Sequence, residues 1–392
     1  MVMFNLVLAN KRYKARSGFT LVNFIALGRL FALWLIVIQS ALTLTGCATT
    51  DEGEAQALPT LVFPPPPDEP RFIFERTILG STDIEVEDRK TRWRQMLTGE
   101  PQVGTGFAKP FDVAVCQGRI YVSDTVRRRV LTFDVPGRHF FQIGEKEPGL
   151  LIKPLGLSTD ADCNVYVADA TMKRIAIYDQ EGNFLRALGG LKFFERLSHV
   201  TVDPEGTRVF AVDTGGVKSE LHRVRVFDAV SGNHLYDIGK RGNGDGEFNL
   251  PRDIDIGPDG NLYVVDSGNF RVEIFKQDGS FVGKFGEIGR RSGQFGRPKG
   301  IGVDNNGNVY VSDASFGNFQ IFDPNGRLLL FIGSRSTNFE RAKYMLPAGL
   351  DVDEDGRVYM VDQYFQKLDI YRPANLNESE GYLASNRSDA KK

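Results

Sequence analysis

One short phrase recurs six times along the chain, and this repetition limits the possible folds more than any other feature. Each copy reads as two short strands of alternating apolar and polar residues, joined at an aspartate. The aspartates are Asp124, Asp169, Asp213, Asp266, Asp313 and Asp362, with spacings of 45, 44, 53, 47 and 49 residues. A period of this size, made of short strands, is typical of repeat proteins. Each aspartate is therefore first a repeat element.

The copy from Leu250 to Gly286 shows how one repeat is divided. It contains the strands "PRDIDIG", "NLYVVD", "RVEIFK" and "FVGKFG", with the turns "PDG" and "QDG" before the second and fourth strands. The alternation has a period of two, whereas helical repeats need apolar residues at i, i+3 and i+4. The sequence therefore predicts an all-β fold: a six-bladed β-propeller of four-stranded antiparallel blades.

The sixth repeat ends after "KLDIYRP" with only three strands. The segment "RFIFERTILG", Arg71 to Gly80, is similar to the fourth strands of other repeats. We therefore expect an N-terminal strand to complete the sixth blade and close the ring, which protects its edge. The propeller should occupy residues 70–373.

These motifs resemble the NHL-repeat family. Each repeat opens near a proline, continues with the pattern G-N-[VL]-Y-V-x-D-x-x-x-x-R-V-x-x-F, and closes with a glycine-rich connector. The resemblance covers about Lys109 to Arg372, and the third repeat departs most, with Leu197 in the proline position and extra residues in "GGVKSELH". The resemblance implies a propeller. Members of the family include binding scaffolds, RNA binders and metal-dependent enzymes, so the fold does not decide the function.

The repeat aspartates are predicted to be structural. A carboxylate at a strand-to-strand turn can accept backbone N–H bonds, and the residue five places on is basic in most repeats. These basic residues are Arg129, Arg174, Arg271, Lys367 and, if the insertion in the third repeat is skipped, Arg223, whereas the fifth repeat has Asn318. We interpret the aspartates as structural residues that stabilise the turn and form an ion pair with the basic residue.

The N-terminus is similar to a bacterial lipoprotein signal peptide over residues 1–46. A basic stretch precedes an apolar run that ends in Leu44-Thr45-Gly46-Cys47, the pattern at which signal peptidase cuts before a lipidated cysteine. A membrane helix is the first alternative, but Leu30 to Leu44 is shorter than the roughly 20 residues required. A type IV pilin leader is the second, and it is disfavoured because Asn23 stands where pilins carry glutamate.

Ala48 and Thr49 follow the cysteine, without the aspartate that marks retention at the inner membrane in many enterobacterial lipoproteins. We expect a cell-envelope protein, lipid-anchored at Cys47 in the outer membrane and facing the periplasm. Residues 47–69, acidic and then proline-rich, are predicted to form an extended tether. Residues 374–392 are polar and are predicted to be disordered.

Charge argues against a nucleic-acid partner. The chain has a net charge of −2, and only basic charges precede Cys47, so the processed chain would be near −7. Cys116 and Cys163 lie in the first turns of neighbouring repeats. A disulfide between them and two separate small residues both remain open.

Familiar catalytic patterns are absent from the sequence: it has no Gly-x-Ser-x-Gly, Cys-x-x-Cys or His-Glu-x-x-His. Two of the four histidines, His139 and His234, are expected on outermost strands. Aligning the innermost strands instead places polar residues in two rings around the axis. One ring contains Asp112, Gly156, His199, Asp253, Gly300 and Gly349, and the next contains Ala114, Ser158, Thr201, Asp255, Gly302 and Asp351.

The candidate binding residues at the channel mouth are therefore Asp112, His199, Asp253, Asp255 and Asp351. Asp112, His199 and Asp253 are also candidate ligands for a divalent cation such as calcium. The alternative, which we favour, is that polar residues simply line a water-filled channel.

Because the repeat platform is well supported and catalytic sets are missing, we expect a binding or scaffolding propeller for a protein, peptide or glycan partner. The alternative is a metal-dependent hydrolase or lyase with its site at the channel mouth. Metal-dependent lyases that resemble this fold use several histidines, and the axis has one.

Replacing the candidate lipidation residue tests the anchor. We expect Cys47→Ser to release the protein from the membrane fraction or leave it uncleaved, because a thioether-linked lipid cannot form on serine. Fractionation followed by immunoblotting measures this. Unchanged membrane partitioning of a processed variant would contradict a lipid anchor.

Overall fold

The computed structural model describes residues 59–85, 93, 96–99 and 103–384. The propeller lies within the unit Thr60–Lys392. The predicted signal peptide and the lipidation candidate Cys47 lie outside the described residues. Within those residues, no helix has the length and apolar character needed to cross a membrane.

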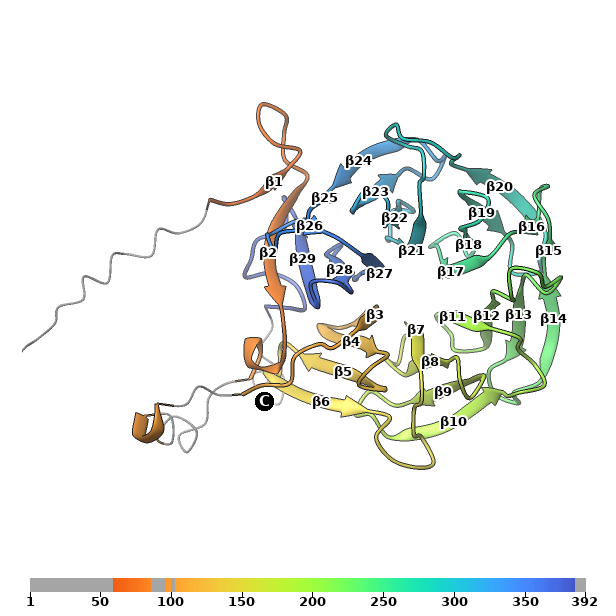
Figure 1. Cartoon of the computed structure of the whole chain (residues 1–392), viewed down its shortest axis with the longest axis horizontal. Coiled ribbons are helices and arrows are strands. Elements are labelled where there is room, and N and C mark those ends of the chain that lie inside the picture. Colours follow the sequence, from red (N-terminus) through yellow and green to blue (C-terminus); the bar gives the residue numbers. More distant parts are fainter. Residues whose placement is uncertain (1–58, 86–92, 94–95, 100–102, 385–392) are drawn as a thin grey trace, which may run out of the picture. The chain divides into compact units, whose positions relative to one another are not determined.

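Six antiparallel blades of four strands surround a central opening (Figure 1), as predicted, and one short extra strand extends the sheet of the sixth blade. Blade 1 contains β3 (Pro110–Cys116), β4 (Arg119–Asp124), β5 (Arg129–Asp134) and β6 (His139–Ile143). Blade 2 contains β7 (Pro154–Thr159), β8 (Val165–Asp169), β9 (Arg174–Tyr178) and β10 (Phe184–Gly189). Blade 3 contains β11 (Leu197–Val202), β12 (Arg208–Asp213), β13 (Arg223–Asp228) and β14 (His234–Ile238).

The remaining blades follow the same order from the axis outward. Blade 4 contains β17 (Pro251–Ile256), β18 (Leu262–Asp266), β19 (Arg271–Phe275) and β20 (Phe281–Phe285). Blade 5 contains β21 (Pro298–Val303), β22 (Val309–Asp313), β23 (Asn318–Phe322) and β24 (Leu328–Ile332). Blade 6 contains β27 (Pro347–Val352), β28 (Val358–Asp362), β29 (Lys367–Pro373) and β2 (Phe72–Ile78).

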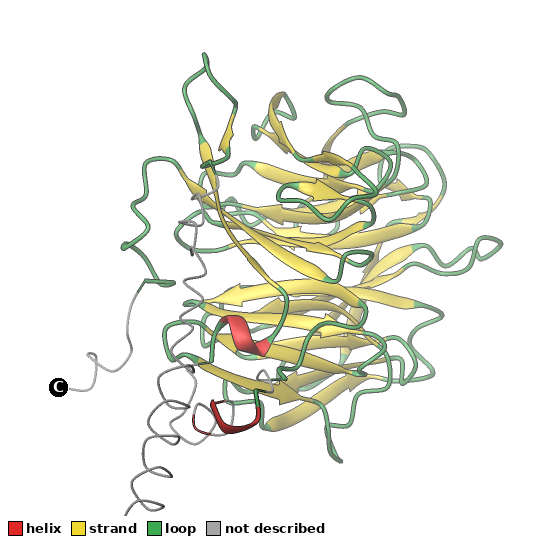
Figure 2. Cartoon of the chain, turned by 60° about the vertical axis from the view of Figure 1, so that its left-hand side comes forward, coloured by secondary structure: helices red, strands yellow, loops and turns green. Residues whose placement is uncertain are grey.

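Two short parallel pairs lie in the connectors between blades: β15 (Lys240–Arg241) with β16 (Glu247–Phe248), and β25 (Ser334–Arg335) with β26 (Lys343–Tyr344). Figure 2 shows that strands make up the body of the unit and that helix is confined to short turns such as Ser81–Asp83.

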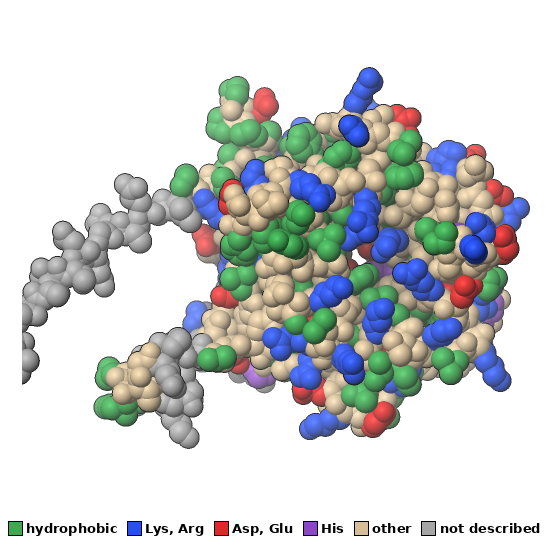
Figure 3. All heavy atoms as spheres, viewed as in Figure 1, with side chains coloured by type: hydrophobic (Ala, Val, Ile, Leu, Met, Phe, Trp, Pro, Cys, Tyr) green, Lys and Arg blue, Asp and Glu red, His purple; other side chains and the backbone are tan. Residues whose placement is uncertain are grey.

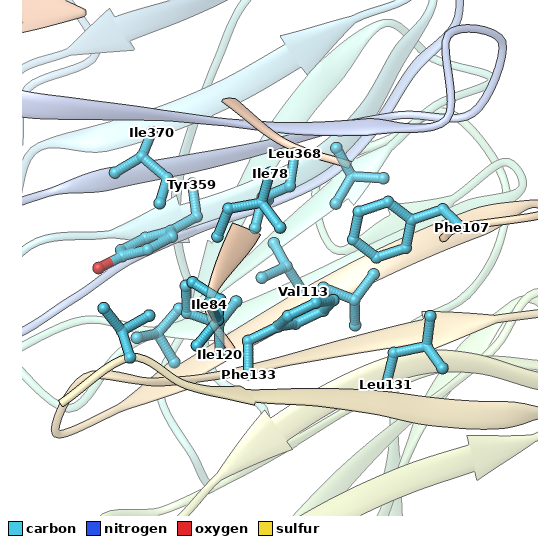
Figure 4. Packing of buried hydrophobic residues seen from close by; sticks show 14 of the residues in the cluster. Ile78, Ile84, Phe107, Val113, Ile120, Leu131, Phe133, Tyr359, Leu368 and Ile370 are labelled. Carbon is cyan, nitrogen blue, oxygen red and sulfur yellow. The ribbon is translucent and has the colours of Figure 1, made fainter. Parts of the chain in front are cut away.

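Burial follows the position of each strand within its blade. The second strands, such as β18 and β22, are buried at every residue because neighbouring blades cover both of their faces. The outermost strands, such as β20, are largely exposed. The apolar side chains form six clusters, one at each interface between adjacent blades. The cluster between blades 6 and 1 includes Ile78 of the closing strand (Figure 4).

The predicted ring closure is confirmed. β2 pairs antiparallel with β29, from Phe72 opposite Pro373 to Ile78 opposite Leu368. Glu75 of β2 forms an ion pair with Arg357 at 2.9 Å, and both side chains are almost fully buried. Thr77 donates a hydrogen bond of 2.6 Å to Asp369. The closing strand is therefore held by buried polar contacts as well as by its ladder.

Both predicted domain boundaries differ from the structure. The tether was expected to reach residue 69, but β1 (Val62–Phe63) pairs with β2, and Phe63 packs on Tyr371 at 5.8 Å between ring centroids. The disordered tail was expected from residue 374, but residues 374–384 pack on the propeller, with Leu383 buried in the cluster between blades 6 and 1. Apolar side chains inside these polar segments account for both differences.

The buried pair at the closure gives a stability prediction. Glu75→Gln should lower the free energy of unfolding by about 3 kcal/mol, because it leaves the buried Arg357 guanidinium with only the longer contact to Asp355 at 3.3 Å. Urea unfolding measures the change. The control is Arg71→Gln, directly before the same strand, where the side chain is exposed. Equal losses in the two variants would contradict this role of Glu75.

Candidate functional site

The six repeat aspartates are fully buried at the ends of the second strands. Each accepts backbone N–H bonds from the connector that enters its own blade: Asp124 from Lys109 at 2.9 Å, Asp169 from Lys153 at 3.1 Å, and Asp213 from Arg196 at 2.8 Å. Most also accept N–H bonds from the turn that follows, as Asp124 does from Val126 and Arg127. The carboxylates therefore hold together two loops on one face of the propeller.

The predicted ion pairs form in only two repeats. Arg271 contacts Asp266 at 3.2 Å and Arg223 contacts Asp213 at 3.5 Å. Three other basic residues have different partners: Arg129 pairs with Glu145, Arg174 donates to backbone carbonyls, and Lys367 pairs with Asp369. The ion-pair prediction is wrong for these three, because each of these basic side chains reaches another acceptor.

Three of the predicted axial residues converge at one point. His199 Nε2 lies 2.7 Å from Asp112 Oδ2 and 2.8 Å from Asp253 Oδ1, so residues of blades 1, 3 and 4 meet. His199 reaches past blade 2 because Gly156 has no side chain: a Cβ there would lie 2.3 Å from the imidazole ring. We call Asp112, His199 and Asp253 the axial cluster.

The axial carboxylates also join adjacent blades. Asp112 accepts an N–H bond from Leu157 of blade 2 at 2.7 Å, and Asp253 accepts one from Ile301 of blade 5 at 3.1 Å. One layer away, the carboxylate oxygens accept N–H bonds in the same manner, Asp255 from Val303 and Asp351 from Val115, each at 2.8 Å. Every bond runs from one blade to the next.

This bonding bears on the metal hypothesis. The ligand atoms of the axial cluster lie within 4.8 Å of one another, a spacing that a cation can bridge. Calcium requires six to eight oxygen ligands, whereas this cluster offers two carboxylates whose oxygens already accept bonds from His199 and from backbone N–H groups. The donor set does not fit calcium and is better described as a hydrogen-bonded clamp.

The ionisation of the cluster follows from its contacts. Burial by itself would lower the pKa of His199, but the adjacent Asp253 and Asp112 carboxylates outweigh it and raise that pKa well above its usual value. Burial raises the pKa of Asp255 to about 7, and burial together with the Asp255 charge raises the pKa of Asp351 well above its usual range. His199 is thus charged at neutral pH and holds two buried carboxylates together.

The channel has unequal ends. On the side of the turns that follow the innermost strands lies a cavity of about 440 Å³, whose lining includes Asp255, Asp351 and Glu354. On the other side is a hollow of about 30 Å³, whose lining includes Arg252, Lys299 and Phe111. His199 lines both spaces, so the axial cluster lies between them.

Six basic residues surround the hollow, and we call them the basic ring. They stand directly before or after the first position of an innermost strand: Lys109, Lys153, Arg196, Arg252, Arg297 and Lys299. Within the described part of the chain, none of the six forms a salt bridge. On the face seen in Figure 3, Lys and Arg side chains gather around the central opening.

The local field at the basic ring is strongly positive. Burial, with the charges of Arg252 and Arg297, lowers the pKa of Lys299 to about 8. Burial and the charges of Arg196 and Arg297 also lower the pKa of Arg252. The turns at the opposite face are instead acidic, with Asp162, Glu205, Asp259, Glu354 and Asp355. The propeller therefore has a basic face and an acidic face.

The basic ring is the feature that the sequence interpretation missed, because net charge was taken for the whole chain. The signal was present: the residue before the first strand is basic in four repeats, and the repeat aspartates fix the backbone of those four positions. The structure also joins Cys116 and Cys163 in a disulfide, with Cα atoms 5.7 Å apart. His139 and His234 lie on the outermost strands β6 and β14.

Comparison with known proteins agrees with this geometry. The family profile described as NHL repeat matches residues 248–275 and 295–322. The chain carries NHL repeats. Its matches include Protein brain tumor of Drosophila melanogaster, 33% identical over 138 residues, and Protein lin-41 of Caenorhabditis elegans, 29% identical over 140 residues. The matched segments span 34% and 36% of this chain but only 12% of each relative.

Solved structures share the fold of the NHL propeller. A Bacteroides thetaiotaomicron protein of unknown function aligns with a TM-score of 0.55 at 17% identity, covering 76% of this chain and 75% of that one. A Xanthomonas campestris gluconolactonase aligns with a TM-score of 0.50 at 18% identity, covering 76% and 98%. At this identity the likeness concerns the fold alone.

Removing the central imidazole tests the axial clamp. His199→Ala should lower the free energy of unfolding by about 3 kcal/mol at pH 7.5, because two buried carboxylates are left facing each other. The loss should shrink at pH 5: a raised carboxyl pKa in the folded variant means that protonation restores stability as the pH falls.

The control for this prediction is His139→Ala, on an outermost strand, which should change the unfolding free energy by less than about 0.5 kcal/mol at either pH. Urea unfolding at the two pH values gives all four numbers. A loss in His199→Ala that does not depend on pH would show that the carboxylates are not opposed in the folded protein.

Proposed function

We propose that this chain is an envelope-anchored lipoprotein whose NHL propeller binds a protein, peptide or glycan partner at its basic face. The observation that carries the proposal is the basic ring: six cations around one mouth, without salt-bridge partners among the described residues. A fold that needed these charges for its own stability would pair them, as it pairs the buried Arg357 with Glu75.

The arrangement of the ring supports recognition rather than chance. Four of its residues have their backbone N–H groups bound by the repeat aspartates, so their positions are set by the most regular part of the fold. Anchored side chains of one charge sign around a concave mouth attract and orient a partner of opposite sign.

The anchor belongs to the same proposal. Cleavage before Cys47 would place the lipid 15 residues ahead of the first described strand, β1. An outer-membrane position facing the periplasm is proposed from Ala48 and Thr49. A short lipid-anchored tether would hold the propeller at the membrane surface and raise its effective concentration for a partner located there.

Charge reversal on the two faces tests this function. The ring variant combines Lys109→Glu, Lys153→Glu and Arg297→Glu, and the matched control combines Arg186→Glu, Arg208→Glu and Lys276→Glu, which are exposed outside the ring. We expect wild type and control to retain the same envelope partner in a crosslinking pull-down. The ring variant should recover about tenfold less of this partner, or even less than that.

Recovery should also fall with added salt, since exposed charges are screened. A partner retained equally by the ring variant and the control would overturn binding at the basic face.

A second candidate function is a metal-dependent hydrolase or lyase. The observation in its favour is the axial cluster, whose ligand atoms lie within 4.8 Å of one another. Metal analysis of the purified protein tests it. About one bound ion per chain in wild type, lost in Asp253→Asn, would support this function over the binding one.

A further inference from the structure

Arg252 and Lys299 differ from the other members of the basic ring. They stand at the second positions of the adjacent strands β17 and β21 and line the 30 Å³ hollow, together with Phe111, Ser198 and Ala348. Both side chains are half-buried, whereas the other four members of the ring are exposed. Two cations therefore share a small recess at the centre of the basic face.

The backbone on which these two residues stand is fixed by hydroxyl groups. Thr214 donates a hydrogen bond to the carbonyl of Pro251 at 2.8 Å, and Ser198 donates one to the carbonyl of Arg252 at 3.0 Å. Ser267 donates in the same way to the carbonyl of Pro298 at 2.9 Å. The stems of Arg252 and Lys299 are therefore preorganised, which lowers the entropy lost when a ligand binds.

An anion at this recess would relieve repulsion that the folded chain otherwise carries. Burial and the neighbouring positive charges disfavour the charged form of both residues, and the carboxylates of Asp253, for Arg252, and Asp362, for Lys299, offset this only in part. Charged groups held together without compensation are typical of binding sites rather than of structural ones.

We propose that Arg252 and Lys299 form a seat for a carboxylate on an acidic segment of the protein partner, with one carboxylate oxygen in the hollow. This inference rests on the proposed function and names the chemistry of its central contact. The hollow is small, with about 30 Å³ open to the centres of water-sized groups, so it suits a small, slender planar group. Guanidinium and carboxylate form two parallel hydrogen bonds in such a pair.

Apolar walls also favour a peptide side chain. Phe111 and Ala348 border the recess, so the methylene groups of a glutamate have an apolar surface to cover, while the other ring residues attract further acidic side chains.

Defined probes test the seat. Fluorescence anisotropy would compare a hexaglutamate peptide with blocked termini, its hexaglutamine counterpart and a hexauridylate RNA, with inorganic phosphate as competitor. We expect hexaglutamate to bind and hexaglutamine not to bind. Arg252→Met with Lys299→Met should weaken hexaglutamate binding at least about tenfold, whereas Lys153→Met with Arg196→Met, which removes two ring charges outside the hollow, should cost less than about threefold.

Folding is checked from the thermal midpoint of each variant. Lys299→Met should be at least as stable as wild type, because it removes a partly buried cation that lies beside two others. If the inner double variant unfolds, Arg252→Lys replaces it: this change keeps the charge but removes the guanidinium fork, and we expect a loss of about threefold or more.

Three results would overturn the seat. Equal losses in the inner and outer variants would mean that only the overall charge matters. If hexaglutamate does not bind while recovery of the envelope partner still depends on the ring, the carboxylate seat is rejected and the proposed function remains. Equally tight binding of hexauridylate or phosphate, lost in the same inner variant, would replace the carboxylate by phosphate. Failure of the proposed function itself appears only in the charge-reversal pull-down.

Discussion

The propeller depends on acceptors for the backbone N–H groups of its six innermost strands. Each of these strands is an edge of its own sheet, and an edge leaves a row of N–H groups without a ladder partner. In three of these strands, β3, β7 and β21, N–H groups of that row donate to carboxylate oxygens of an adjacent blade, which belong to Asp351, Asp112, Asp253 and Asp255. The bonds that satisfy the edges therefore also hold the blades in register around the axis.

This solution concentrates charge at the axis, and the neighbouring residues accommodate it. The imidazole of His199 supplies positive charge between two carboxylates, and it reaches them only because Gly156 leaves space in the blade between. Gly349 has the same role beside Asp112, since a Cβ there would lie 1.8 Å from a carboxylate oxygen. Gly156 and Gly349 of the axial ring therefore leave the space that the charged side chains occupy.

Much of the fold could be predicted from the sequence, because each repeat states the same strand pattern and the missing fourth strand has a recognisable copy near the N-terminus. The residues at the axis could be predicted as well, since alternation assigns them to one face of a strand. Their partners could not. Whether Arg129 contacts Asp124 or Glu145 is decided by packing between connectors distant in sequence.

The basic ring differs from the other polar groups of the propeller, because the fold does not require its charges. Repeat aspartates, axial carboxylates and hydroxyl groups all form hydrogen bonds with backbone groups. The side chains of Arg252 and Lys299 do not bond to the backbone in this way. They stand on a backbone fixed by three hydroxyl groups, and their positive charges repel each other. A scaffold this regular gains no stability from such a pair, so its positions are best explained by a ligand that arrives from outside the chain.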